Sequence, residues 1–219
     1  MINQNILNLY NLDLLPKDHK NYLNEIQTLN PIIIYDIGSN VLHWTREANK
    51  VWKNSKIICF DALKEVSFLY KEYEYYNYVL SDKNDETKVF YKSLIYSGGS
   101  SIFKENPKIN KNADKYFNDE NSEIVQTYTL DYVVQKYNLE LPDLIKLDVQ
   151  GSELNILKGS KNTLKNVKDI IIELQDVEYN IGSPKKEEVI LYLEEQGFTC
   201  VKEKFSDNGF DADYHFKRI

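Results

Sequence analysis

Short apolar runs alternate along the chain with segments in which apolar residues recur at helical spacing. Such runs, bounded by turn-forming residues, are typical of strands that are buried on both faces of a sheet. We predict strands at 32–35, 56–60, 75–80, 144–147, 169–173, 198–204 and 212–217, and helices at 43–53, 63–72, 129–137, 152–165 and 185–196. Because strands and helices alternate, we expect an α/β fold with a seven-stranded, mostly parallel sheet and helices on both faces. The expected strand order is 3-2-1-4-5-7-6, with the last strand antiparallel at or near the edge.

Two segments stand outside this alternation. Residues 1–30 carry leucines and isoleucines at near-helical spacing, which predicts an N-terminal helical extension to a main domain at 31–219. Between positions 81 and 128, two extended segments at 87–93 and 123–129 flank a long polar loop, which predicts a β-hairpin and loop insertion. Loops of this length are usually functional or mobile.

Composition and charge narrow the class of protein. Of the 219 residues, 42% are hydrophobic, and no apolar run approaches the roughly 20 residues that a membrane-spanning helix needs. The formal net charge of −7 argues against a broad nucleic-acid surface. The N-terminus lacks the basic and apolar regions of a secretion signal, and two cysteines agree with a reducing compartment. We therefore expect an intracellular, cytoplasmic protein.

The turn after the first strand carries the most informative residues, Asp36, Gly38 and Asn40. Ligands of open α/β sheets bind at the carboxyl ends of the strands. A dinucleotide fold needs several glycines here to approach a pyrophosphate, so a nicotinamide dehydrogenase is disfavoured. The Asp36 carboxylate would repel a phosphate and suits an ammonium group, which favours S-adenosylmethionine as the ligand. The alternative is that Asp36 only caps the turn.

An acidic residue also ends the second strand. Asp61 follows Gly38 by 23 positions, close to the offset of roughly 20 at which an acid binds ribose hydroxyls. Its carboxylate can accept hydrogen bonds from both hydroxyls at once. The alternative is a helix N-cap for the segment that begins at Leu63, but in combination with Asp36 and Gly38 we favour the ribose role.

These residues resemble the FkbM family of S-adenosylmethionine-dependent methyltransferases. The matching segments lie, in the family's order, at 35–40, 60–61, 79–82, 129–131, 143–159 and 170–173. The resemblance implies a Rossmann-like class I methyltransferase fold and methyl transfer, usually to an oxygen of a sugar, polysaccharide or natural product. It also implies that the methionine end of the cofactor contacts Asp36, Gly38, Ser39 and Asn40, and that the ribose contacts Asp61 and Ala62. The adenine is expected at Ser81 and Asp82, and Asp148 and Glu153 are expected at the rim of the cleft.

The chain departs from the family pattern at three positions. Leu42 stands where the family usually has a second glycine, so the backbone is expected to run farther from the cofactor. Asp61 replaces a longer glutamate and shortens the reach of the carboxylate. Gln150 replaces the acid of the family's D-x-E-G segment, which removes one carboxylate but leaves an amide that can orient a hydroxyl. Leu42 and Gln150 also motivate an alternative function, a non-catalytic S-adenosylmethionine-binding module.

An alcohol acceptor has to lose a proton, which requires a general base. The candidates are Asp148, at the end of the fourth strand, and His43, at the start of the first helix of the main domain. The alternatives are that Asp148 orients the amine of the cofactor and that His43 only packs. Contacts to the acceptor are expected from Tyr96, Gly99, Ser100, Ser101, Gln150, Glu153 and Glu173, although the glycine-serine segment could also be a plain hairpin loop.

The remaining candidates concern metals and charged partners. The three histidines have no metal-ligand spacing and both cysteines fall inside predicted strands, so no metal centre is expected, while carboxylate-bound Mg²⁺ stays open. Lys104, Lys108, Lys111 and Lys115 form a basic stretch that is usually a solvated face, and an anionic acceptor such as a sugar nucleotide could use it. We expect an O-methyltransferase for a sugar, glycan or related small molecule; a nucleic-acid methyltransferase is the weaker enzyme alternative.

Overall fold

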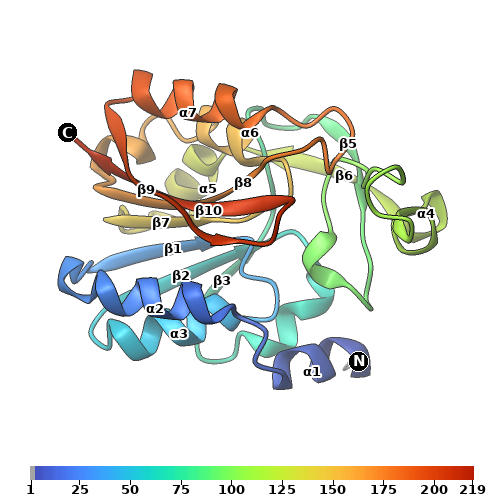
Figure 1. The fold of residues 1–219 in the computed structure, drawn as a ribbon, viewed down its shortest axis with the longest axis horizontal. Coiled ribbons are helices and arrows are strands. Elements are labelled where there is room, and N and C mark those ends of the chain that lie inside the picture. Colours follow the sequence, from blue (N-terminus) through green and yellow to red (C-terminus); the bar gives the residue numbers. More distant parts are fainter. Residues whose placement is uncertain (1–2) are drawn as a thin grey trace.

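A seven-stranded sheet forms the centre of the computed structural model, which describes residues 3–219 (Figure 1). Its strand order is β3-β2-β1-β7-β8-β10-β9. The strands are β1 (Ile33–Ile37), β2 (Lys56–Asp61), β3 (Glu74–Asn77), β7 (Leu144–Leu147), β8 (Asp169–Gln175), β9 (Phe198–Asp207) and β10 (Asp211–Arg218). The first five strands of that order pair in parallel, and β10 pairs antiparallel with both β8 and β9. When these seven strands alone are counted along the chain, the order is the predicted 3-2-1-4-5-7-6.

Helices cover both faces of the sheet because alternate residues of each central strand are buried on opposite sides. Ile34 of β1 packs with Trp44 and Ala48 on one face, whereas Ile33 and Tyr35 pack with the helices on the other. Figure 1 shows α2 and α3 on the first face and α5, α6 and α7 on the second. The helices are α1 (Gln4–Asn11), α2 (Lys17–Glu25), α3 (His43–Val51), α5 (Leu130–Tyr137), α6 (Glu153–Lys158) and α7 (Lys186–Glu195).

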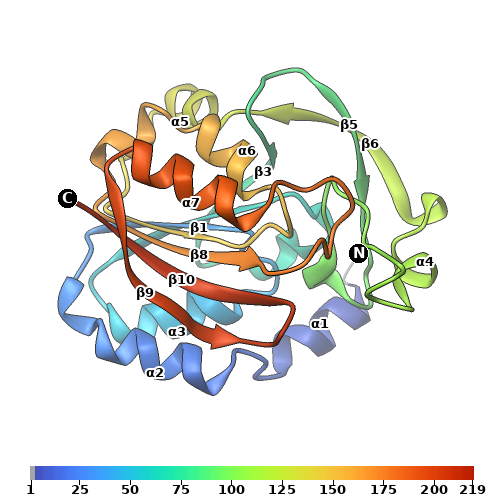
Figure 2. The same ribbon diagram turned by 45° about the horizontal axis from the view of Figure 1, so that its top comes forward.

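The insertion forms a separate small sheet of order β4-β6-β5, made of β4 (Val79–Leu80), β5 (Thr87–Tyr91) and β6 (Ser122–Tyr128). The predicted pair at 87–93 and 123–129 is the antiparallel pair β5–β6. Between these strands lie two short 3-10 helices, Ser97–Gly99 and Asp119–Asn121, and the single-turn helix α4 (Ala113–Tyr116). In Figure 2 this insertion lies at the end of the sheet toward which β8 points, so it stands where a ligand of the sheet is expected.

Three predicted elements have different forms in the structure. The predicted strand at 75–80 is broken at Tyr78, because Val79 and Leu80 leave the main sheet and pair with β6. The predicted helix at 63–72 is a 3-10 helix over Lys64–Leu69. The predicted helix at 152–165 ends at Lys158, and a 3-10 turn over Thr163–Asn166 follows it.

Residues of the predicted N-terminal extension pack on the main sheet. Helix α2 contacts β9 and α3, and a 3-10 turn (Gln27–Leu29) leads from it toward β1. His19 and Tyr22 of α2 are buried, and their side chains reach Asp213 and His215 of β10 at 3.0 and 2.8 Å. The division of the chain into 1–30 and 31–219 stays a prediction. No helix in the described part of the chain is long and apolar enough to cross a membrane.

Candidate active site

A cavity of about 660 Å³ lies at the carboxyl ends of β1, β2, β7 and β8, a size within the range of small-molecule sites. Residues of the insertion between 96 and 117 and of the N-terminal segment between 9 and 16 also line it. Most predicted site residues line this cavity, namely Asp36, Gly38, Ser39, Asn40, His43, Asp61, Ala62, Tyr96, Gly99, Ser100, Ser101, Asp148, Gln150 and Glu173. Ser81, Asp82 and Glu153 are not among its lining residues.

The turn after β1 requires a glycine at position 38. Gly38 has a φ of +83°, which side chains rarely adopt, and a Cβ there would overlap the carbonyl oxygen of Asp148. The backbone nitrogens of Gly38 and Ser39 both lie within hydrogen-bond distance of the carbonyl oxygen of Phe60, at 2.9 and 3.2 Å. The ends of β1, β2 and β7 therefore meet tightly at the floor of the cavity.

The residues after this turn keep a left-handed backbone. Asn40 has a φ of 40° and Leu42, at the N-cap of α3, has a φ of 64°. Leu42 therefore adopts the backbone region that usually favours glycine, and its side chain is buried. The side-chain oxygen Oδ1 of Asn40 is buried and has no hydrogen-bond partner within residues 3–219. Such an orphaned acceptor beside a cavity indicates a ligand that donates a hydrogen bond.

Asp36 lies in β1 below the turn, 1% exposed, and accepts a hydrogen bond from the Thr45 hydroxyl. Burial raises its pKa to about 7, with the nearby Asp148 and Asp61 carboxylates adding to the rise and Thr45 and Lys146 opposing it. A cation bound in the cavity would offset that penalty, because it favours the ionised carboxylate. The buried position of Asp36 thus leaves both its predicted roles open, as a ligand contact and as a support of the turn.

Asp61 ends β2 and holds two backbone segments. Its carboxylate oxygens accept from the backbone nitrogens of Asn40 and Leu63, both at 2.7 Å. Burial raises its pKa to about 6 in spite of these two bonds. Each carboxylate oxygen has a second lone pair, so the cap at Leu63 and a contact to ribose are compatible.

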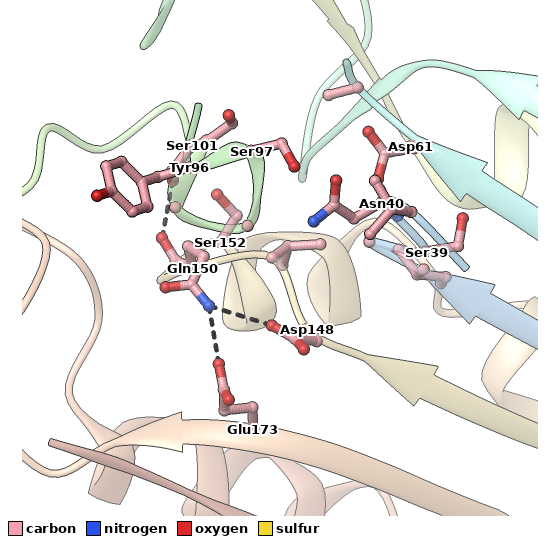
Figure 3. A pocket seen from close by; sticks show the side chains of 18 of the residues that line it. Ser39, Asn40, Asp61, Tyr96, Ser97, Ser101, Asp148, Gln150, Ser152 and Glu173 are labelled. Carbon is pink, nitrogen blue, oxygen red and sulfur yellow. Dashed lines mark hydrogen bonds between the residues drawn. The ribbon is translucent and has the colours of Figure 1, made fainter. Parts of the chain in front are cut away.

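The loop after β7 brings three predicted residues together (Figure 3). The amide nitrogen Nε2 of Gln150 donates to Asp148 Oδ1 at 3.1 Å and to Glu173 Oε2 at 2.8 Å. Burial, and next the charge of Asp148, raise the pKa of Glu173 well above its usual value. Gln150 thereby links the ends of β7 and β8 at the wall of the cavity.

Lys146 is a site residue that the sequence analysis missed. It lies in β7 with its side chain 3% exposed, and its Nζ is 3.5 Å from Asp148 Oδ2 and 3.4 Å from Asp213 Oδ1. Burial alone would lower its pKa, but the Asp148 and Asp213 carboxylates hold it above the ordinary value. The sequence contained an indication of this role, because a lysine inside an apolar, buried strand needs a charged partner.

The His43 side chain is hydrogen-bonded to the N-terminal segment of the chain. Its Nε2 lies 2.9 Å from the carbonyl oxygen of Leu9, which can only accept, so this nitrogen donates to α1. Burial lowers the pKa of His43. The imidazole lines the cavity while it anchors the N-terminal helix, and it forms no hydrogen bond with Asp148 or Gln150.

Three further predicted site residues, Ser81, Asp82 and Glu153, lie outside the cavity. The break of the chain at Tyr78 places Val79 and Leu80 at the cavity instead of Ser81 and Asp82, and the Ser81 backbone bonds to β6. Glu153 points back into its own loop, where Oε1 accepts from the backbone nitrogens of Val149 and Gly151 at 3.0 and 3.3 Å. Burial raises its pKa to about 7.

The insertion supplies the opposite wall of the cavity. Ser101 Oγ donates to the carbonyl oxygen of Gln150 at 2.7 Å, which ties the insertion to the loop after β7. The rings of Tyr96 and Tyr116 pack edge to face with their centres 4.5 Å apart. Ser97 Oγ is buried without a hydrogen-bond partner among residues 3–219. No group of three or more His, Cys, Asp or Glu side chains in that range is arranged to hold a metal ion.

Comparisons with known proteins agree on one class. The family model for the methyltransferase FkbM domain matches residues 35–200. The hexuronic acid methyltransferase AglP of Haloferax volcanii is 33% identical over 81 residues, which cover 37% of this chain and about a third (34%) of that protein.

Two solved structures share the fold over most of both chains. An O-methyltransferase from Bacillus cereus, in complex with SAH, has a TM-score of 0.52 at 12% identity and covers 97% of this chain and 85% of its own. Magnesium protoporphyrin IX methyltransferase from Synechocystis PCC 6803, with bound SAH, has a TM-score of 0.50 at 9% identity. The match covers 98% of this chain and 93% of that protein. At these identities the likeness concerns the fold.

Proposed function

Because the chain belongs to the methyltransferase FkbM domain family, we propose that it is an S-adenosylmethionine-dependent methyltransferase that methylates a hydroxyl oxygen of a sugar, glycan or related small molecule. The observation that carries this proposal is a single cavity that joins the first-turn residues, including Asn40 and Asp61, to the Asp148–Gln150–Glu173 cluster. A ligand at the first turn and an acceptor at the cluster would therefore share one space.

The residues of the first turn fit the cofactor. Asn40 Oδ1 is a buried acceptor without a partner, and Asp61 keeps a free lone pair on each oxygen. Asp36 and Asp61 supply carboxyl groups at this end of the cavity, and their ionised forms suit a cationic ligand. We assign the methionine end to residues 38–40 and the ribose to Asp61. S-adenosylmethionine supplies, when bound, a methyl group on a positively charged sulfur.

The cluster on the other side fits the handling of an acceptor hydroxyl. Asp148 is the proposed general base, because its side chain is 36% exposed and lines the cavity. Gln150 donates to one of its oxygens and Lys146 lies beside the other, and these two contacts orient the carboxylate. The protein's main contribution to such a displacement is to hold the acceptor in line and to take up its proton.

The name of the relative, a hexuronic acid methyltransferase, supports a sugar as the acceptor. Because the match spans about a third of that protein, its activity enters here only as support. The competing function is a non-catalytic module that binds S-adenosylmethionine.

The first test is ligand binding. S-adenosylhomocysteine should raise the melting temperature, and NADH should not. Asp61→Ala should weaken S-adenosylhomocysteine binding, whereas Asp148→Ala should reduce turnover more than binding. Absence of any shift with S-adenosylhomocysteine in folded protein would refute the cofactor assignment, and Asp148→Ala protein with normal turnover would refute the assignment of the base. Binding without methylation of any compound in a cell extract would favour the non-catalytic module.

A further inference from the structure

The part of the cavity wall formed by the insertion and by the ends of β7, β8 and β10, which we name the acceptor half, is rich in carboxyl groups. Glu105 of the insertion, Asp148 after β7, Glu173 of β8 and Asp211 of β10 all line it. Burial raises the pKa of Glu105 and of Asp211, the latter to about 6, with the Asp148 charge as a further cause at Asp211. Burial thus desolvates Glu105 and Asp211, and the charge of Asp148 also disfavours the ionisation of Asp211.

No free positive charge balances them. Among residues 3–219, Lys146 is the one lysine that lines the cavity, and no arginine does. Lys146 is already held between Asp148 and Asp213. The lysines of the insertion are not among the lining residues of the cavity: Lys104 pairs with Asp114 at 3.5 Å, and Lys115 lies 4.9 Å from the centre of the Tyr116 ring. The basic stretch predicted as a site for anionic acceptors therefore does not reach the cavity.

Two polar side chains of the insertion are built to bind a ligand here. Glu105 is 4% exposed, and its Oε2 accepts from Asn110 at 2.7 Å. Ser97 is 5% exposed, and its Oγ is buried with no partner within residues 3–219. Both residues line the cavity, and Figure 3 shows Ser97 on the insertion side of it. Buried hydroxyls are normally satisfied, so the missing partner of Ser97 Oγ points to a bound molecule.

The other side chains of this wall are aromatic or neutral. Tyr96, Tyr116 and Tyr179 present rings, and Asn110 and Asn208 present amides. Rings pack on the apolar faces of a molecule while carboxylates, amides and hydroxyls bind its hydroxyl groups. This combination suits a polyhydroxylated compound, whereas a carboxylate or phosphate on that compound would face buried carboxyl groups without a cation.

We propose that the acceptor is a polyhydroxylated compound without negative charge, bound through its hydroxyls by Glu105 and Ser97, and that the acceptor half rejects uronates and sugar phosphates. The inference rests on the proposed function and narrows it, and it differs from what the name of the hexuronic acid relative would suggest. Glu105 is then the residue that determines specificity, by accepting hydroxyl protons and by repelling anions.

The test begins with the natural acceptor. The protein is incubated with methyl-deuterated S-adenosylmethionine and an extract of its source cells, and mass spectrometry identifies the sugar or polyol unit that gains the label. We expect a unit without a carboxylate or phosphate. Label on an anionic unit would overturn the inference and leave the methyltransferase function intact. No label, in protein that binds S-adenosylhomocysteine, would instead refute the proposed function, and the inference with it.

Glu105→Gln then tests the residue on the labelled acceptor. The variant keeps the shape of the side chain and removes its charge, and Glu120→Gln is the matched control, because Glu120 is an exposed glutamate of the same insertion. We expect Glu105→Gln to raise KM for the acceptor at least tenfold and to leave the Kd of S-adenosylhomocysteine within twofold, while the control changes neither. A KM within twofold of the parent, in folded Glu105→Gln protein, would remove Glu105 from acceptor binding.

Discussion

Replacing Gly38 by alanine tests whether the close approach of β1 and β7 organises the site. An L residue in the left-handed region costs roughly 1–2 kcal/mol. The new Cβ would also overlap the carbonyl oxygen of Asp148, and relief of such an overlap typically costs about 1–3 kcal/mol. We therefore expect the free energy of unfolding to fall by about 3 kcal/mol, which corresponds to roughly 6–12 °C in melting temperature for a chain of this size.

Gly209→Ala separates the two contributions. Gly209 has a φ of +89°, but no atom lies within 4 Å of a Cβ built there, so this variant carries the backbone cost alone. Thermal unfolding and calorimetric titration with S-adenosylhomocysteine are compared for both variants. We expect Gly38→Ala to lose more stability than Gly209→Ala and to bind the ligand at least tenfold more weakly, with Gly209→Ala binding normally. Equal losses of stability and normal ligand binding in both variants would show that β7 can shift away from the new Cβ without an energetic penalty. That result would refute the reasoning.

Stability should fall as the pH rises from about 4 to 7, because burial raises the pKa of Asp36 and of Glu153 to about 7 and the folded protein keeps protons that the unfolded chain releases in this window. Denaturant unfolding across the window should show a shallower slope for Glu153→Gln; an unchanged slope contradicts the assignment. His43→Ala should lower the free energy of unfolding by about 1 kcal/mol, through loss of the bond to α1, and change turnover less than threefold. A loss of turnover beyond a hundredfold would reinstate His43 as the base. Lys146→Met should cost about 3 kcal/mol in denaturant unfolding, because it removes the lysine beside the buried Asp213 carboxylate and leaves that carboxylate with His19 alone; parent-like stability would contradict this.

The main sheet could be predicted because its central strands are buried on both faces and therefore appear in the sequence as continuous apolar runs. Every residue of β1 and β7 is buried, and the two strands are neighbours in the sheet. The helices between them were visible through their spacing. The conserved handedness and short connections of such units then leave few possible strand orders.

The structure differs from the sequence-based expectation at side chains whose surroundings depend on distant parts of the chain. The strand at 75–80 has the expected pattern, but β6, some 45 positions later, captures Val79 and Leu80 and so moves Ser81 away from the cavity. His43 is engaged by Leu9, which belongs to a segment that the motif does not include. Lys146 could have been noticed, but its partner Asp213 lies in the last strand and has no local signal.

Leu42 and Gln150, the two departures that motivated a non-catalytic module, have different meanings in the structure. Leu42 adopts the left-handed backbone in spite of its side chain, and burial of that side chain, worth about 2 kcal/mol, offsets the backbone cost. Gln150 donates from one amide nitrogen to both Asp148 and Glu173. An ionised glutamate at position 150 could not donate at all and would add a carboxylate beside Glu173, whose ionisation burial and the Asp148 charge already disfavour. Both departures are therefore compatible with an intact site.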